Sequence, residues 1–329
     1  MNDLTLEITK KCPMSCVLCS SEGGEPYPKE FSLHELKSIV DQAKSLGVTQ
    51  ISLSGGEPLT YPHILDICKY IANLGIEVFV YTSGNTINEN NSISSISVDY
   101  FLKLKSAGVK EIVFSIHGSN PQIHDKITRR EGSFANLLES IKNSQTVELN
   151  VDVHFVPVRA NFRYLPLIVS LIKSSGLDSL HILRFIPQGR GYENKDQLAL
   201  SVDETLELRE ILAKLMFDSN MRIVIGAHYN ELGLSDNKCT AGIEKAVIRP
   251  DGLVFPCVGM KTVEKFIDLN DVRCNSLKYI INESYGFRLL RQILTNNAEI
   301  LQQDTNECDF NNYCSISSTT PYNHSAFNS

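Results

Sequence analysis

Residues 32–58 read SLHELKSIVDQAKSLGVTQISLSGGEP and contain the pattern from which the fold class can be predicted. Its first half places apolar residues at steps of three and four, which is the period of an amphipathic helix. Ser32 and Glu35 form a capping box at the start of that helix, and Gly47 ends it. A short β-rich run, Gln50–Leu53, follows directly. The stretch is therefore one unit of helix, glycine and strand.

The same unit recurs along the first 230 residues. Segments with helical spacing end at four glycines that precede strands: Gly47, Gly75, Gly108 and Gly176. Runs with β character occupy Leu4–Ile8, Gln50–Leu53, Glu77–Thr82, Glu111–Ile116, Glu148–Val156 and Ser179–Ile186. Consecutive βα units close right-handed into a parallel sheet, and eight of them would need more chain. The sequence therefore predicts an α/β fold of six units, either a partial barrel or a doubly wound sheet.

The pattern changes near residue 230. Two short β-type runs, Ala246–Ile248 and Leu253–Phe255, flank a Pro-Asp-Gly turn and predict a hairpin. Helical spacing returns over Leu277–Thr295. We therefore expect two domains, residues 1–232 and residues 233–329, of which the second is a small α+β domain.

Composition excludes several classes of protein. The chain has 329 residues, with 31 Lys and Arg against 38 Asp and Glu, so its formal net charge is −7. This acidic balance argues against nucleic acid as a partner. No stretch reaches the ~18 apolar residues of a membrane span, and the first twenty or so residues lack a signal-peptide pattern. We expect a cytoplasmic protein whose nine cysteines stay reduced and bind a metal or cofactor.

Three of these cysteines follow the first strand in the pattern Cys-x3-Cys-x2-Cys: Cys12, Cys16 and Cys19. Three thiolates on one loop can hold a soft metal or an iron–sulfur cluster. Zinc is the alternative, because Cys16 and Cys19 make a two-residue pair of the kind that zinc sites use. Zinc needs a fourth ligand, however, and no nearby Cys or His supplies one. The set favours a cluster that keeps one iron open.

The cysteine pattern and its place resemble the signature of the radical S-adenosylmethionine (radical SAM) superfamily. The resemblance covers residues 1–230 and implies a partial (β/α)6 barrel that holds a [4Fe–4S] cluster, with SAM chelated at the open iron. Residues 54–58, Ser-Gly-Gly-Glu-Pro, resemble the family's motif for the SAM ammonium, which assigns SAM binding to Gly55, Gly56, Glu57 and Pro58. One departure is Leu18, where many relatives carry an aromatic residue or histidine.

The resemblance also implies SAM contacts farther along the barrel. Ser83 ends the third strand and Ser115 the fourth, where relatives place polar groups near the methionine and ribose. Arg129 follows Ser115 at the spacing of an arginine that pairs with the SAM carboxylate. It can equally be a solvated residue beside Arg130 and Glu131.

A second cysteine group resembles the SPASM/twitch auxiliary-cluster domains that follow radical SAM barrels. This resemblance implies a second [4Fe–4S] cluster with four ligands: Cys239, Cys257, Cys308 and Cys314. Thr305 and Ser318 stand where the full pattern has further cysteines, so we expect one auxiliary cluster and not two. A structural zinc site with the same four thiolates is the alternative.

Candidates for the catalytic residues are weaker. His117 and Arg184 are the best placed to face a substrate, and Cys274 is a minor candidate for a hydrogen-atom donor. Cys68 is expected in the core. The remaining scattered histidines are expected to be ordinary polar residues: His63, His124, His154, His181 and His228.

The family resemblance implies an enzyme of the oxidoreductase or epimerase type. It implies reductive cleavage of SAM to a 5′-deoxyadenosyl radical, which abstracts a hydrogen atom from the substrate, with a flavodoxin or ferredoxin as electron donor. Cys12 lies too near the first residue for a preceding peptide-binding domain, so we expect a small carbohydrate or aminocyclitol as substrate. A peptide maturase that forms a cross-link or an epimer is the alternative. A non-enzymatic zinc or electron-transfer protein is the alternative of another class.

Overall fold

The computed structural model describes residues 1–88, 92–218, 220–226, 229, 232–234, 239–262 and 270–295. Within these residues, nine strands form one sheet in the order β11-β10-β1-β2-β3-β6-β7-β8-β9. The strands are β1 (Asp3–Thr9), β2 (Gln50–Gly55), β3 (Glu77–Thr82), β6 (Val109–Ile116), β7 (Asn150–Phe155), β8 (Ser179–Ile182), β9 (Arg222–Ile225), β10 (Lys245–Ile248) and β11 (Val254–Phe255). A separate pair is formed by β4 (Asn85–Ile87) and β5 (Ile93–Ser95).

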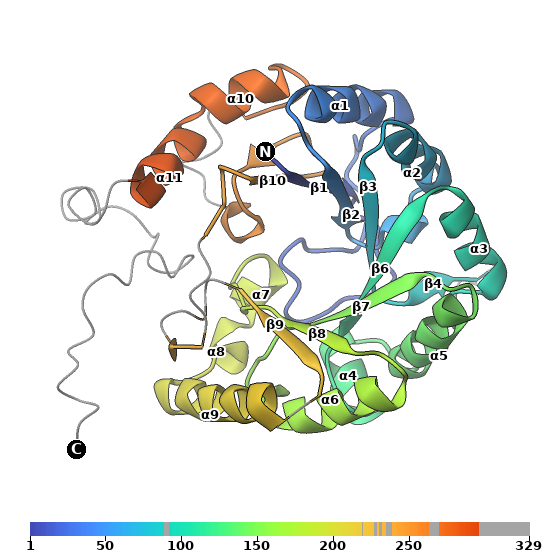
Figure 1. Ribbon diagram of the computed structural model, residues 1–329, viewed down its shortest axis with the longest axis vertical. Coiled ribbons are helices and arrows are strands. Elements are labelled where there is room, and N and C mark those ends of the chain that lie inside the picture. The colour runs from blue at the N-terminus through green and yellow to red at the C-terminus, as the bar shows by residue number, and fades with distance from the viewer. Residues whose placement is uncertain are drawn as a thin grey trace.

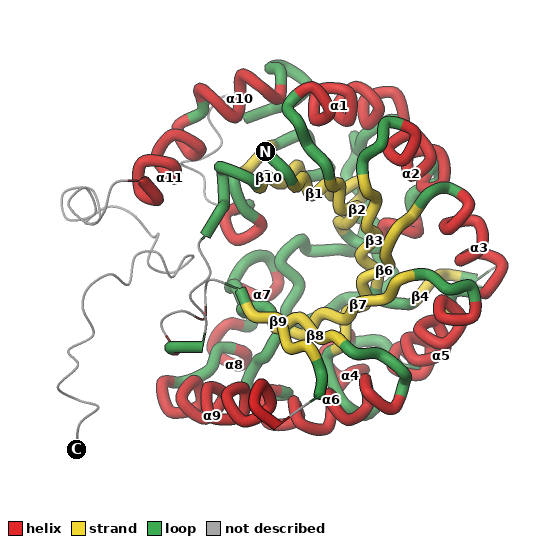
Figure 2. Tube along the Cα trace, in the orientation of Figure 1, coloured by secondary structure: helices red, strands yellow, loops and turns green. Residues whose placement is uncertain are grey.

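Helices surround the sheet. Figure 1 shows the strands lining the inside of an open arc, while the longer helices follow one another around its outside. The helices are α1 (Leu33–Ser45), α2 (Ile64–Asn73), α3 (Val98–Ser106), α4 (Pro121–Thr128), α5 (Ser133–Thr146), α6 (Leu165–Ser174), α7 (Arg190–Glu193), α8 (Lys195–Leu198), α9 (Val202–Asp218), α10 (Leu277–Glu283) and α11 (Tyr285–Thr295). Figure 2 separates the two layers, with an inner arc of strands and an outer ring of helices.

The predicted α/β barrel is confirmed. From β1 to β9 every neighbouring pair in the sheet is parallel, as consecutive βα units require. The capping box of α1 is present, because Ser32 and Glu35 satisfy each other's backbone N–H groups. The buried face of α1 carries the four apolar residues that its period predicts: Leu36, Ile39, Val40 and Ala43. The core lies between this ring of helices and the sheet.

Two features differ from the sequence-based expectation. The sixth strand ends at Ile182 and not at Ile186, and Arg222–Ile225 adds a seventh parallel strand beside it. The predicted hairpin exists as β10 and β11, but β10 also pairs in parallel with β1. The barrel sheet therefore continues into the segment that follows residue 232. The division into domains at that residue remains a prediction.

Among the helices of the described residues, none combines the length and the apolar character that crossing a bilayer requires.

Candidate active site

The cysteine loop (residues 10–31) joins β1 to α1. Backbone hydrogen bonds fix its path: the N–H of Cys12 donates to the carbonyl of Gly24 at 2.9 Å, and the N–H of Val17 donates to the carbonyl of Ile127 in α4 at 2.9 Å. The loop thus stays at the carboxyl end of β1, the end at which parallel barrels carry their sites. It presents three partly buried free thiols, Cys12, Cys16 and Cys19.

The thiols lie close enough to influence one another. Burial and, to a smaller extent, the neighbouring Cys19 together raise the pKa of Cys16 to about 12. Burial also raises the pKa of Cys12, and the neighbouring Cys16 and Cys19 contribute to this rise. These groups ionise when a metal supplies positive charge, since metal binding releases thiol protons.

Backbone donors already point at two of the sulfurs. Met14 N donates to Cys12 Sγ, and Gly23 N donates to Cys19 Sγ, both at 3.4 Å. Such N–H···S bonds stabilise thiolates around iron–sulfur clusters. The loop offers three thiols and contains no further Cys or His. Its donor set therefore fits a cluster with one iron left for another ligand.

The glycine-rich segment that follows β2 packs directly against the cysteine loop. A Cβ at Gly56 would meet the carbonyl oxygens of Lys10 and Lys11 at 2.4 Å, and one at Gly55 would meet Thr9 O at 2.2 Å. Gly55 also has φ +130°, which side chains rarely adopt. Only glycine permits this close approach of two backbones. The contact brings the Gly-Gly-Glu-Pro segment and the cysteine loop to one place.

Glu57 is almost fully buried and connects the ends of β2 and β3. Its Oε1 accepts from Thr82 Oγ1 at 2.8 Å, while its Oε2 accepts from the Ser83 N–H at 2.8 Å and Ser83 Oγ at 2.7 Å. Burial raises the pKa of Glu57, and the hydrogen bonds from Ser83 and Thr82 oppose that rise. The carboxylate thus braces the loop; its assignment to the SAM ammonium remains a prediction.

The other residues predicted to contact SAM occupy different positions. Ser83 lies at the end of β3, and Ser115 lies in β6 one residue before its end. Pro58 is buried at the start of a 3-10 turn, Pro58–Thr60. Arg129 is exposed, with φ +54°, at the carboxyl end of α4. The proposed pairing of Arg129 with the SAM carboxylate remains a prediction.

The weak catalytic candidates do not gather in one site. His117 is buried against His124, whose Nδ1 accepts from the His117 N–H at 3.1 Å, and burial lowers the pKa of His117 to about 4. Arg184 lies partly buried in the segment after β8. Cys274 is exposed, with Sγ 3.8 Å from Asp271 Oδ2. Cys68 is fully buried in the core, as predicted.

Two of the predicted auxiliary ligands come together. Cys239 and Cys257 flank one small apolar cluster, and the proximity of Cys239 adds to the rise that burial causes in the pKa of Cys257. Gly259 N donates to Cys257 Sγ at 3.3 Å, the same kind of bond as in the cysteine loop. Cys308 and Cys314 lie outside the described residues, as does His228.

A cavity of about 350 Å³ opens beside the cysteine loop. Charged and aromatic side chains from both ends of the described chain line it, among them Glu7, Lys10, Tyr27, Tyr192, Arg249 and Lys261. No local sequence pattern predicts this set, because its members come from β1, the cysteine loop, α7 and the segments that follow β10 and β11.

A buried ion pair stands in the wall of this cavity. Lys261 Nζ contacts Glu7 Oε1 at 2.5 Å, and the two side chains are only 3% and 6% exposed. Ser21, two residues after Cys19, donates to the same Glu7 oxygen at 2.8 Å and receives a bond from Lys261 at 2.6 Å. The pair joins the first strand, the cysteine loop and the segment after β11.

Comparison with known proteins finds a family model and several relatives that resemble this chain. Residues 6–158 match the model of the radical SAM superfamily. Over 333 residues the chain is 24% identical to the AdoMet-dependent heme synthase of Oleidesulfovibrio alaskensis, covering 94% of this chain and 80% of that protein. Over 294 residues it is 25% identical to the PqqA peptide cyclase of Bradyrhizobium diazoefficiens, covering 87% of this chain and 74% of that one.

The fold agrees with these matches. The crystal structure of Streptococcus suis SuiB bound to S-adenosylmethionine superposes with a TM-score of 0.70 at 18% identity, covering 95% of this chain and 71% of SuiB. The matched segment contains the three cysteines, the glycine-rich loop and the strands that carry Ser83 and Ser115. Residues 6–158 therefore match the radical SAM superfamily, and the fold of the described residues agrees with that match.

Proposed function

We propose that this chain is a radical SAM enzyme that starts its reaction by removing a hydrogen atom from a peptide substrate. The observation that carries the first part is the convergence of three thiols, two of them supported by backbone N–H groups, with a glycine-rich backbone at the carboxyl ends of β1 and β2. When bound, the cluster supplies one electron to SAM, whose cleavage yields methionine and the 5′-deoxyadenosyl radical that takes the hydrogen atom.

The chain's own residues hold and orient these groups. Cys12, Cys16 and Cys19 bind three irons, and the missing fourth ligand leaves one iron for SAM. Backbone groups of Gly55 and Gly56 lie close to the start of the cysteine loop, which would hold the cluster, because neither residue carries a side chain. Glu57 fixes Ser83 through two hydrogen bonds and so sets the position of the β3 end. Each of these residues binds or orients a group and does not itself react, as expected for an enzyme whose cofactor supplies the reactive chemistry.

The cavity beside the cysteine loop is the proposed substrate site. Its lining combines carboxylates, cations and phenols, which suit the amides and polar side chains of a peptide. A relative named as a peptide cyclase aligns with 87% of the chain and supports the peptide class. The small carbohydrate expected from the sequence has no such relative among the proteins compared above.

The predicted auxiliary cluster completes the proposal. Cys239 and Cys257, which lie close together, are proposed ligands with Cys308 and Cys314. A cluster with four protein thiolates has no open iron, so its proposed role is to accept an electron from the substrate radical. This favours net oxidation, such as cross-link formation, over epimerisation. A flavodoxin or ferredoxin is the proposed source of the electron that starts the reaction, and a cytoplasmic location is proposed with it.

Deuterium transfer tests the substrate class. The reduced, reconstituted enzyme would be incubated with SAM and with perdeuterated peptides encoded beside its gene, with a deuterated aminocyclitol as the comparison. Deuterium in 5′-deoxyadenosine from a peptide alone supports the proposal. Deuterium from the aminocyclitol alone contradicts the peptide class but leaves the radical chemistry intact. Colourless protein that holds two zinc ions and releases no 5′-deoxyadenosine would instead support the non-enzymatic alternative.

Iron counting tests the auxiliary site separately. Replacing Cys239 and Cys257 by Ala should lower the iron content from about eight to about four per chain, because each cubane cluster holds four irons. Release of 5′-deoxyadenosine without substrate should continue, while turnover stops. An unchanged iron content, or zinc in place of iron, contradicts the second cluster.

A further inference from the structure

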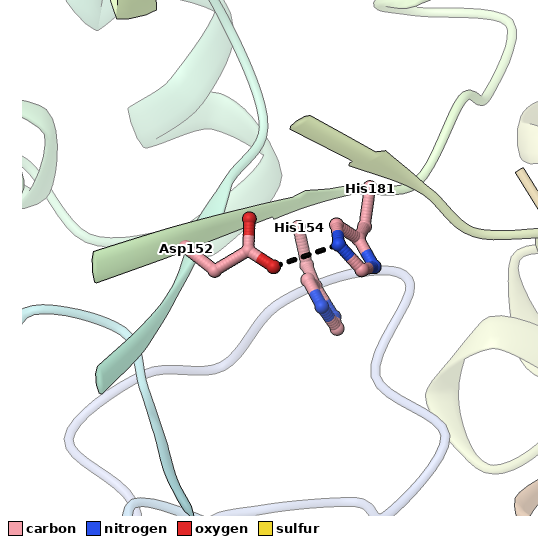
Figure 3. A group of neighbouring side chains, drawn as sticks. All are labelled: Asp152, His154 and His181. Carbon is pink, nitrogen blue, oxygen red and sulfur yellow. Dashed lines mark ion pairs between the residues drawn. The ribbon is translucent and has the colours of Figure 1, made fainter. Parts of the chain in front are cut away.

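Three side chains of the barrel wall gather on its inner face. Asp152 and His154 stand two residues apart in β7, so they point to the same side of the sheet, and His181 extends from β8 beside them (Figure 3). Their strand neighbours Val153 and Leu180 are fully buried in the core under the helices. The three polar groups therefore face the interior of the arc.

The group lies near the rim that carries the proposed active site. Strand register pairs Ser115 with His154, and His154 with His181, across β6, β7 and β8. Each of these residues stands one position before the end of its strand. Residues in register form one layer across parallel strands. The two histidines thus share the layer of Ser115, and Asp152 lies one layer deeper.

The distances suit a metal ion. One ligand atom from each of Asp152, His154 and His181 lies within 4.8 Å of the other two, and no other trio of Cys, His, Asp or Glu in the described residues meets this limit. Asp152 Oδ2 and His181 Nε2 are 2.8 Å apart. The two imidazole rings stack with centroids 5.0 Å apart and an interplanar angle of 16°. An ion pair accounts for the contact between Asp152 and His181, and the ring of His154 also packs edge-on against Tyr81, with centroids 5.2 Å apart.

Hydrogen bonds engage one carboxylate oxygen of Asp152 and leave the other available to a metal ion. Its Oδ1 accepts from the Val153 N–H at 2.7 Å and from Ser179 Oγ at 2.8 Å. Its Oδ2 points instead toward His181 (Figure 3). Outer hydrogen bonds that hold one carboxylate oxygen and leave the other free are the usual support of a metal ligand.

An ion can reach the group from the amino ends of the strands. A cavity of about 460 Å³ reaches Asp152 and is also lined by Glu111, Asp178 and Arg222. Its three carboxylates outweigh the one guanidinium among these four residues, which favours entry of a cation. Of the three residues, Asp152 lines this cavity, and the side chains of Asp152 and His181 remain 11% and 28% exposed.

We propose that Asp152, His154 and His181 bind one divalent transition-metal ion. Zn²⁺ is the ion used to test this proposal. Two imidazoles and one carboxylate are a common ligand set for zinc and for Fe(II). The ion would lie between Asp152 Oδ2 and His181 Nε2 in place of their direct contact, with a ring nitrogen of His154 as the third ligand. Three protein ligands leave a position for water or for an oxygen of a bound ligand. The site is separate from both cysteine groups and does not rest on the proposed reaction.

Metal counting on the reconstituted full-length protein tests the proposal. After dialysis against Zn²⁺ and then buffer, the protein should retain one zinc ion per chain in addition to its iron. His181→Ala, His154→Ala and Asp152→Asn should each weaken zinc binding at least tenfold, the loss expected for a missing ligand. Iron and sulfide contents should stay unchanged, which shows that the variants fold. The matched control is His63→Ala, which removes an exposed histidine paired with Asp66 at 3.2 Å.

X-ray absorption at the zinc edge needs no variant. Nitrogen and oxygen neighbours at about 2.0–2.1 Å support the site, whereas sulfur at about 2.3 Å would place the zinc on cysteines and overturn the proposal. Absence of zinc beyond the cluster metals, or equal zinc retention by the three variants, would overturn it as well.

Discussion

Glu57 illustrates what single side chains contribute to this site. It is 1% exposed, yet Thr82 and Ser83 direct three hydrogen bonds to its carboxylate from the next strand. The motif in the sequence identified Glu57, but only the structure shows that its carboxylate oxygens accept hydrogen bonds from residues at the end of β3. The ends of β2 and β3 lie close together because the two strands pair in the sheet, and a local sequence pattern does not reveal this pairing.

Glu57→Gln should destabilise the protein. The amide nitrogen would face a donor where Oε2 now accepts two hydrogen bonds, and an unsatisfied buried group costs about 1–3 kcal/mol. Urea unfolding at pH 7 should report a fall of that size in the free energy of unfolding. Glu139→Gln, an exposed change in α5, serves as the control and should alter stability by less than about 0.5 kcal/mol. Equal stability of the two variants would contradict the bracing role.

His117 should make stability depend on pH. Burial lowers its pKa to about 4, so the folded protein binds fewer protons there than the unfolded chain does between pH 4 and the ordinary value of 6.5. Its contribution is complete above pH 6.5 and is lost as the pH falls toward 4. Between pH 7.5 and pH 5, His117→Gln should lose about 2 kcal/mol less stability than the wild type, at 1.36 kcal/mol per pKa unit. Parallel pH profiles would contradict this environment for His117.

At the scale of elements, the contact between the cysteine loop and the segment after β2 builds the site. The sequence predicted both segments and their chemistry, because each follows a recognisable strand. It did not reveal β9, since the four residues Arg222–Ile225 are too short for a periodic signal. It also treated His154 and His181 as isolated, because only strand register brings them together.

Gly56→Ala should separate the two segments. Its Cβ would overlap the carbonyls of Lys10 and Lys11, which are backbone atoms that cannot rotate away. The cysteine loop would then move, and the iron retained after reconstitution should fall by about four per chain, the content of one cluster. Gly24→Ala, in the same loop, meets no atom closer than 3.9 Å and should keep the wild-type iron content. Equal iron in both variants would show that the close approach is not needed.

At the scale of the whole molecule, the last described segments complete the barrel instead of standing apart from it. Strand β10 extends the sheet beside β1, and Lys261 reaches the inner carboxylate of Glu7. The repeated βα pattern of the sequence ends near residue 230, but this pattern could not show that the following hairpin joins the sheet. Contacts between residues more than 250 positions apart leave no local trace in a single sequence.

Lys261→Met should therefore be costly. It leaves Glu7 as a buried, unpaired carboxylate, and breaking a buried pair in this way costs about 3–5 kcal/mol. The double change Glu7→Gln with Lys261→Met should recover part of that loss in urea unfolding. The exposed pair of Lys110 and Glu77 provides the comparison, because Lys110→Met should cost less than about 1 kcal/mol. Similar costs for the two lysines would argue against a buried link.

The central claim is that Cys12, Cys16 and Cys19 hold the cluster that cleaves SAM. Its most direct test is the release of 5′-deoxyadenosine by anaerobically reconstituted, reduced protein, measured for the wild type and for the variant with all three cysteines replaced by Ala. The wild type should release 5′-deoxyadenosine, and the variant should release none while keeping about four irons per chain in the second cluster. Release that persists in the variant, or no release from iron-loaded wild type, would contradict the account.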